Sequence, residues 1–244
     1  MPRTHADRAA FVQSLDTGSP IHPSLLTVSD DQPSAAVDAG SAISFVGTLP
    51  KQLRSDVLNS TLLAQLAANK KYDRQKQTTQ WYDYYKDILE NVGWVVQGFS
   101  LGAQSDASTY GSVDKLLLKL AAAFLDPTEL NLFQTMIDSL KEDKSSEQSK
   151  LFDSQAKNFN EANFQLGVAS NDDGNAVFKI GVYAYSASEN IDRVLFYTFG
   201  KQAVSFYAGS QTMVLDNDIY RQVREDVLKK LGNHAVGLVE GIEI

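Results

Sequence analysis

The pattern in this sequence that comes nearest to a catalytic element is a serine set between two glycines at residues 98–102, GFSLG. In α/β-hydrolases a G-x-S-x-G pattern places a nucleophilic serine on a strained turn between a strand and a helix. A histidine must then accept the proton of that serine, and His234 is the one histidine that follows residue 47. Ser100 and His234 are therefore the candidate catalytic residues.

The sequence around Ser100 favours a structural role for this serine. Two helical segments precede it where the hydrolase fold has alternating strands and helices, and a polar loop at 102–111 follows it. Glycines within a strand also permit a bulge or the close approach of a helix. A serine hydrolase using Ser100 is therefore the second alternative among the functions considered.

The sequence offers little support for a metal or cofactor site. It has no cysteine and three histidines, none of which is spaced as a pair of ligands on a helix. Residues 171–175, NDDGN, contain acidic and amide side chains but place Ala176 and Val182 where a calcium-binding EF-hand needs glycine and glutamate. This segment therefore predicts a hairpin turn, and we expect neither a metal nor a cofactor.

Aromatic residues are dense between residues 72 and 94. Trp81 and Tyr85 share the apolar stripe of a predicted helix, whereas Tyr82 and Tyr84 point in other directions and Tyr72 precedes that helix. A helix with aromatic residues on several sides is either deeply buried or has a second surface to cover. Tyr72, Tyr82 and Tyr84 are therefore candidate binding residues for a ligand or partner.

The rest of the chain predicts the elements that position these residues. Amphipathic spacing predicts helices over 48–71, 73–92, 112–125, from 126 and over 146–160, with a further helix after residue 216. Residues 162–215 change to a two-residue period with short turns, which predicts an antiparallel meander of four strands. Edge strands are predicted near 94–101 and 235–244. The expected fold is α+β, with an antiparallel sheet of about five to six strands covered by helices.

Residues 1–47 differ from the remainder of the chain. They contain four of the six prolines, Pro2, Pro20, Pro23 and Pro33, and one short predicted helix over Ala6–Leu15. We interpret residues 1–47 as an extended arm rich in proline and serine, and residues 48–244 as a single α+β domain. Ordering such an arm costs conformational entropy, so we expect it to dock on its own domain or on a neighbouring subunit.

Net charge and composition limit the classes of partner and the cellular compartments that we expect for this protein. The chain of 244 residues has 22 Lys and Arg against 30 Asp and Glu, a net charge of −8, which argues against nucleic acid as a partner. No signal peptide and no apolar run long enough to span a membrane is evident. We expect a soluble protein that is cytoplasmic, or exported without a cleavable signal peptide.

Three functions remain. The first is a non-enzymatic interaction or assembly protein that uses its arm and an aromatic surface to bind a protein partner or itself. The second is a membrane-active protein of pore-forming or virulence type, whose helices move away so that strands at 176–186 and 203–215 insert, because a strand that spans a bilayer needs about 9–11 residues. The third is the hydrolase using Ser100.

Overall fold

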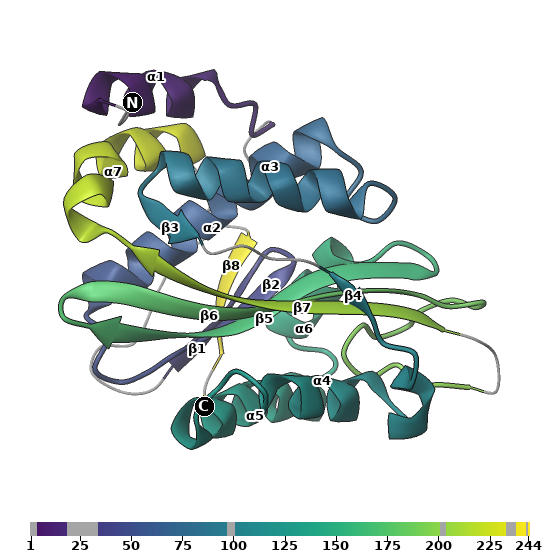
Figure 1. Cartoon of the computed structure of the whole chain (residues 1–244). Coiled ribbons are helices and arrows are strands. Elements are labelled where there is room, and N and C mark those ends of the chain that lie inside the picture. The colour runs from purple at the N-terminus through teal and green to yellow at the C-terminus, as the bar shows by residue number, and fades with distance from the viewer. Residues whose placement is uncertain (1–3, 19–33, 97–100, 201–203, 233–237, 243) are drawn as a thin grey trace.

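The computed structural model describes residues 4–18, 34–96, 101–200, 204–232, 238–242 and 244. These residues form three layers, in which one sheet lies between two groups of helices (Figure 1). The helices are α1 (His5–Ser14), α2 (Lys51–Lys71), α3 (Thr78–Asn91), α4 (Val113–Ala121), α5 (Pro127–Glu142), α6 (Glu147–Ala156) and α7 (Asn217–Leu231), with a 3₁₀ turn at Ala107–Tyr110. The strands are β1 (Ser34–Asp38), β2 (Ser41–Phe45), β3 (Trp94–Val96), β4 (Gly102–Ala103), β5 (Glu161–Asp172), β6 (Asn175–Ser186), β7 (Ser205–Leu215) and β8 (Val239–Ile242).

The sheet has the strand order β3-β7-β6-β5-β2-β1-β8, and β4 lies beside β7. Its longest part is the antiparallel meander β5–β6–β7. Asp173 and Gly174 join β5 to β6 with φ angles of 47° and 83°, as a two-residue hairpin turn requires. β2 runs parallel to β5, and parallel neighbours need a crossover, which the chain from α2 to α6 supplies. Among the described residues of this crossover, only β3 and β4 return to the sheet, where both pair with β7.

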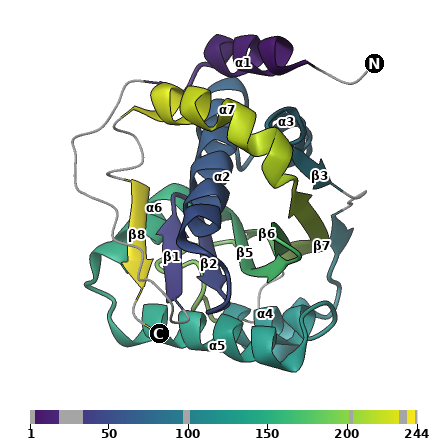
Figure 2. The ribbon, with the colours of Figure 1, turned by 90° about the vertical axis from the view of Figure 1, so that its left-hand side faces the viewer.

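Each face of the sheet packs against its own layer of helices. Helices α2, α3 and α7 cover one face, here called the α2 face, and helices α4, α5 and α6 cover the other, here called the α5 face (Figures 1 and 2). Helix α2 runs down the centre of Figure 2 and is buried over most of its circumference. A helix buried on most sides belongs to the interior, and here it separates the sheet from α7.

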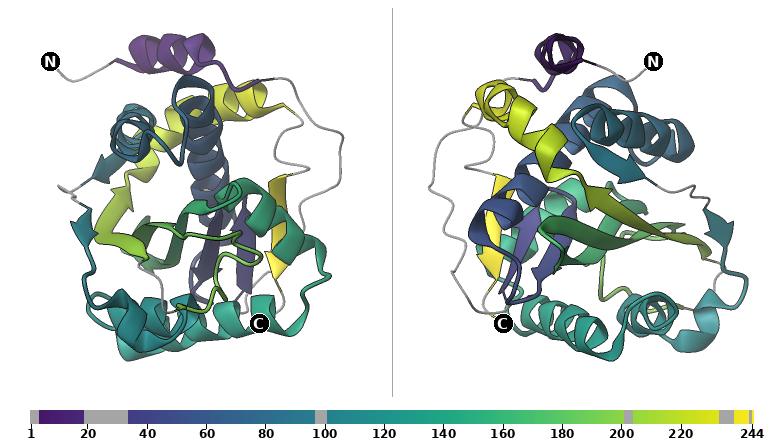
Figure 3. Two further views of the ribbon diagram at one scale, coloured as in Figure 1. Left: turned by 90° about the vertical axis from the view of Figure 1, so that its right-hand side faces the viewer. Right: turned by 60° about the vertical axis from the view of Figure 1, so that its left-hand side comes forward.

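Helix α1 docks on α7 of the same chain (Figure 3). Val12 on α1 is fully buried. The Arg8 guanidinium donates to the Asn91 carbonyl at 2.6 Å, and the Lys230 ammonium donates to the Gln13 carbonyl at 2.9 Å. This part of the predicted arm therefore lies against its own domain.

The sheet differs from the purely antiparallel one that the sequence predicts. Over the described residues it has eight strands, more than the expected five to six, and it is mixed because β2 and β5 are parallel. Strands β1 and β2 occupy residues 34–45, which the sequence pattern assigns to the arm. All ten residues of β1 and β2 are buried and most are alanine or serine, so the alternation that marks a half-exposed strand is missing.

One of the four strands that the sequence predicts within 162–215, at 193–199, is also corrected. This segment consists of bends and turns, with one isolated bridge between Thr198 and Ser112. Its backbone groups find other partners: Asp153 accepts from the Val194 N–H at 2.9 Å, and the Tyr197 carbonyl accepts from the Val113 N–H at 3.0 Å. The meander therefore has three strands in place of the expected four.

The predicted helices are confirmed as α2 to α7, each within a few residues of its expected bounds. Strands lie near both predicted edges, as β3 with the two-residue β4 and as β8. The α+β class predicted from the sequence is confirmed as well, with seven α-helices and the mixed sheet among the described residues.

Phe178 tests the core of the α2 face. Its side chain on β6 is fully buried, and its ring lies 6.1 Å from the Trp94 ring between centroids. We expect F178A to lower the free energy of unfolding by about 3–5 kcal/mol, because it leaves a cavity that the sheet cannot close. Urea denaturation measures this loss.

The matched control is F159A, because the Phe159 side chain is 68% exposed. Truncating it should change the free energy of unfolding by less than about 0.5 kcal/mol. Equal losses for the two variants would contradict the placement of Phe178 in the core.

Candidate functional site

The two candidate catalytic residues, Ser100 and His234, lie outside the described residues. Their pairing therefore stays a prediction from the sequence.

Across the described ranges, no three Asp, Glu or His side chains gather as a metal site would require. Within the same ranges, no helix is both long and apolar enough to cross a membrane.

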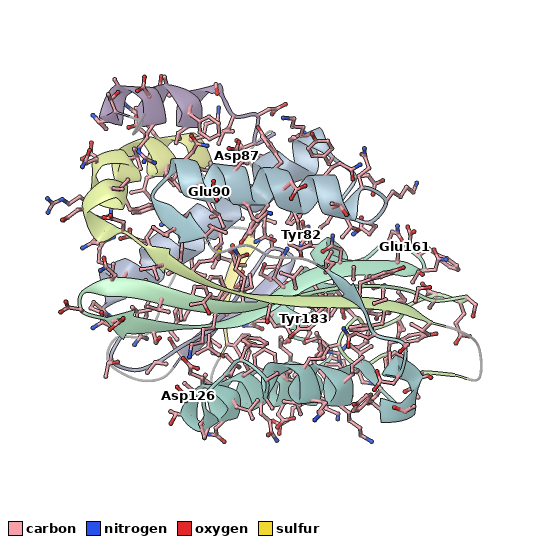
Figure 4. The ribbon with its side chains drawn as sticks, viewed as in Figure 1. Tyr82, Asp87, Glu90, Asp126, Glu161 and Tyr183 are labelled. Carbon is pink, nitrogen blue, oxygen red and sulfur yellow. The ribbon has the colours of Figure 1, made fainter. Side chains whose placement is uncertain are left out.

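The three candidate binding tyrosines separate into two groups. Tyr82 is 3% exposed and lies between α3 and the sheet (Figure 4). Tyr72 and Tyr84 are only partly buried, and their rings meet edge to face at 6.1 Å between centroids. The Lys71 ammonium lies 3.8 Å from the centroid of the Tyr84 ring. Tyr72 and Tyr84 thus share one place at the surface, whereas Tyr82 belongs to the interior.

Arg74, in the connection between α2 and α3, lies at the centre of a buried polar network. Its side chain donates to Gln165 Oε1 at 2.6 Å, to the Gly40 carbonyl at 3.1 Å and to Gln65 Oε1 at 3.0 Å. Its guanidinium also lies 4.4 Å from the centroid of the Trp81 ring, a favourable cation–π geometry. One buried cation therefore joins α2, α3, β5 and the turn between β1 and β2.

The network closes on itself through Tyr82. Gln165 Nε2 donates to the Tyr82 hydroxyl at 2.6 Å, that hydroxyl donates to Asn163 Oδ1 at 3.0 Å, and Asn163 Nδ2 donates to the Arg74 carbonyl at 2.6 Å. Gly40 leaves the room that Arg74 needs, since a Cβ there would lie 2.4 Å from Arg74 Nη1. The network is therefore a closed set of buried hydrogen bonds that connects α3 and the segment before it to β5.

Asp38 on β1 is fully buried at the margin of this network. The Thr61 hydroxyl donates to its Oδ2 at 2.6 Å, and Oδ1 has no hydrogen-bond partner among the described residues. Burial raises the pKa of Asp38 to about 8, although the Thr61 hydrogen bond and the Arg74 charge oppose this rise. Burial lowers the pKa of Arg74 to about 10, so Arg74 stays charged near neutral pH while Asp38 is largely protonated.

Asp38, Arg74, Asn163 and Gln165, which form the buried network, are not among the candidate site residues that the sequence predicts. A signal was nevertheless present in β5, where Asn163 and Gln165 alternate with apolar residues. Polar residues at every second position of a strand usually face solvent. Here they face the Arg74 network, which only the packing of α2 and α3 on the sheet creates.

On the α5 face, the meander presents a continuous apolar surface. Its members come from all three strands: Ala162, Phe164, Leu166, Val168, Tyr183, Tyr185, Phe206 and Ala208. Tyr183 and Tyr82 lie on opposite sides of the sheet in Figure 4. Strand β5 is therefore apolar toward α5 and polar toward the Arg74 network.

Helix α5 covers this apolar surface mainly by apolar packing. Polar contacts between α5 and the sheet include the ion pair of Glu129 Oε2 with Lys179 Nζ at 2.7 Å, and the Ser44 hydroxyl donating to the Leu132 carbonyl at 3.3 Å. Removing the α2 layer would take Arg74 away from the side chains on β5 that now accept its hydrogen bonds. Removing the α5 layer would expose apolar side chains without breaking that network.

Comparison with known proteins gives weak similarities only. No protein-family model and no curated protein sequence matches this chain. The structure of the Evf virulence factor is similar over 80% of this chain and 84% of its own, with 11% identity and a TM-score of 0.37. A delta-endotoxin structure is similar over 81% of this chain and 88% of its own, with 10% identity and a TM-score of 0.43. At these scores, no functional argument is built on either similarity.

The raised pKa of Asp38 predicts a pH dependence of stability. The folded protein binds this proton more tightly than the unfolded chain, in which the carboxyl has its ordinary pKa of 3.8. The contribution of Asp38 to the free energy of unfolding is therefore complete below pH 3.8 and is lost as the pH rises to about 8. Urea denaturation across this window measures the loss.

The variant D38N isolates the effect, because asparagine keeps an acceptor for Thr61 and cannot ionise. We expect the stability of the wild type relative to D38N to fall steadily across the window. Two parallel pH profiles would show that Asp38 does not hold a proton in the folded state.

Proposed function

We propose that this protein is membrane-active, and that the meander β5–β6–β7 enters a lipid bilayer after the α4–α6 layer leaves the α5 face. The observation that carries this proposal is the apolar surface on the α5 face, which follows β5 from Ala162 to Val168 and continues at the neighbouring ends of β6 and β7. The three strands have 12, 12 and 11 residues. A strand that crosses the hydrocarbon of a bilayer needs about 9–11 residues.

Backbone pairing supports the proposal. β5 and β6 pair from Glu161↔Ser186 to Asp172↔Asn175, and β6 pairs with β7 along the whole of that strand. Within a bilayer an unpaired backbone group costs several kcal/mol. A meander that moves as a unit keeps the hydrogen bonds between its own strands, and the outer edges of β5 and β7 stay paired where β2, β3 and β4 move with them.

The distribution of side chains across β5 supports it further. Phe164, Leu166 and Val168 face the covering helices and can exchange them for lipid. Asn163 and Gln165 face the opposite side, where they bond to Tyr82 and Arg74. An inserted β5 would then present lipid with its apolar side and keep its polar side toward protein or water.

The interaction protein is the weaker alternative, because part of each of its two features, the arm and the aromatic residues, is engaged inside this chain. Helix α1 packs on α7, and Tyr82 is buried beneath α3. Binding to a protein partner or to a second copy stays a prediction from the sequence.

A covalent cross-link between α5 and β6 tests the proposal. Because the chain has no cysteine, a thiol-specific cross-linker reacts only with the two cysteines that are introduced. In the variant E129C/K179C, a short bismaleimide would join the two helix and strand positions whose side chains now form an ion pair at 2.7 Å. We expect the tied protein to release far less dye from loaded liposomes than the same variant before cross-linking, because the α5 layer can no longer leave the strand.

The matched control is the variant Q13C/D226C, which ties α1 to α7 at a contact of 3.5 Å between Gln13 Nε2 and Asp226 Oδ1. Cross-linking this pair should leave dye release unchanged, because it does not hold the meander. Equal dye release by E129C/K179C before and after cross-linking, or no dye release by the wild type, would refute the proposal.

A further inference from the structure

A cationic surface lies at the end of the meander where β5 begins and β6 ends. Two adjoining hollows of about 430 and 460 Å³ share Lys144, Asn190 and Asp192 in their linings. The Ile191 N–H donates to the Phe159 carbonyl at 2.8 Å, so the segment before β5 and the segment after β6 are held together there. Glu161 marks this end of the sheet in Figure 4.

The charge of this surface is opposite to that of the whole chain. Five cations line the two hollows, Lys141, Lys144, Lys150, Lys157 and Arg193, against the acidic Asp153, Glu189 and Asp192. The chain as a whole has a net charge of −8. Asp114 and Glu147, just outside the linings, pair with Lys141 and Lys150, so the positive charge that an anionic ligand can complement is that of the lysines without such a partner.

Two of these cations are not neutralised. Lys141 pairs with Asp114 at 3.1 Å, and Arg193 pairs with Asp153 at 3.4 Å. Lys144 and Lys157 make no ion pair within the part of the chain that the structure describes. Their charges are therefore available to a ligand.

Arg193 adds an unused donor. Its Nη2 donates to the Leu140 carbonyl at 2.6 Å, and its guanidinium lies 4.6 Å from the centroid of the Phe196 ring. Its Nη1 is buried and makes no hydrogen bond among the described residues. Buried donors are normally satisfied, so this nitrogen is an exception, and the rest of the guanidinium is held in place by Leu140 and Asp153.

Phe159 stands beside these lysines and distinguishes a membrane from other anionic partners. Its side chain is 68% exposed and lines the second hollow together with Lys150 and Lys157. Aromatic rings favour the interface of a bilayer, at the level of the headgroups, while nearby lysines reach the lipid phosphates. A folded anionic protein would match the charge but would not require an isolated exposed phenyl ring.

We propose that the surface formed by Lys144, Lys157, Arg193 and Phe159 is a docking site for the phosphate-bearing headgroups of an anionic bilayer. This inference rests on the proposed function and adds to it which end of the meander meets the membrane. Lysines bind the headgroups, Phe159 enters the interface, and the first residues of β5 are thereby brought to the lipid.

Vesicle sedimentation tests the site with the full chain and two vesicle types, phosphatidylcholine alone and phosphatidylcholine with phosphatidylserine. We expect K144Q/K157Q to lower the partition coefficient for the anionic vesicles by roughly thirty-fold and to leave weak binding to neutral vesicles unchanged. F159S should lower binding to both vesicle types by roughly five-fold, because its contribution does not depend on charge. The control R221Q/K229Q removes the same charge from α7 and should bind as the wild type does.

Wild-type binding by K144Q/K157Q, or an equal loss for R221Q/K229Q, would overturn the docking site. Inorganic phosphate should displace the protein no more than chloride at equal ionic strength, and a stronger effect of phosphate would assign the surface to a free phosphate ligand instead. Dye release is measured in parallel. Binding through this surface without release would refute the proposed function alone, whereas release that K144Q/K157Q does not reduce would refute the docking site alone.

Discussion

Burial of both faces of β5 and β6 is the constraint on which the rest of this structure depends. Phe178, Ile180 and Val182 need cover on one side, while Phe164 and Tyr183 need it on the other. A sheet with one apolar face needs one layer of helices, and a sheet with two needs two. This requirement places α2 and α5 on opposite sides of the sheet.

The two layers are attached in different ways. The α2 layer is joined to the sheet by a buried cation, Arg74, whose partners lie on four separate elements. Leaving a buried charge without partners costs about 3–5 kcal/mol, so this layer and β5 are expected to stay together. The α5 layer packs mainly through apolar side chains, with the Glu129–Lys179 ion pair as its charged contact to the sheet. In the proposed insertion, this asymmetry makes the α5 layer the one that leaves and the α5 face the one that meets lipid.

Electrostatics act locally in such a molecule. The net charge of −8 disfavours approach to an anionic surface, but salt screens charges that lie more than about 8 Å away at physiological ionic strength. In the proposed docking, the groups nearest the bilayer decide the interaction. Lys144, Lys157 and Phe159 are such groups at the end of the meander.

The sequence by itself determined the local elements. Apolar residues with helical spacing predict α2 to α7, and the NDDGN segment predicts the turn between β5 and β6, because these signals act over a few residues. The same spacing places Tyr82 and Tyr84 on different sides of a helix that also carries Trp81, with Tyr72 before that helix. It does not tell which of them a neighbouring element covers.

Tertiary structure alone decided the sheet order, the parallel pairing of β2 with β5, and the site of the buried charge. Residues 34–45 lack alternation because both of their faces are buried, and β5, the parallel partner of β2, lies more than 100 residues further along the chain. In the sequence, nothing distinguishes Arg74 from an ordinary loop residue. Only the folded chain encloses it between α2, α3 and β5. The cationic surface likewise joins Lys144, Lys157 and Arg193 from three segments, and only folding makes neighbours of charges that lie so far apart in the chain.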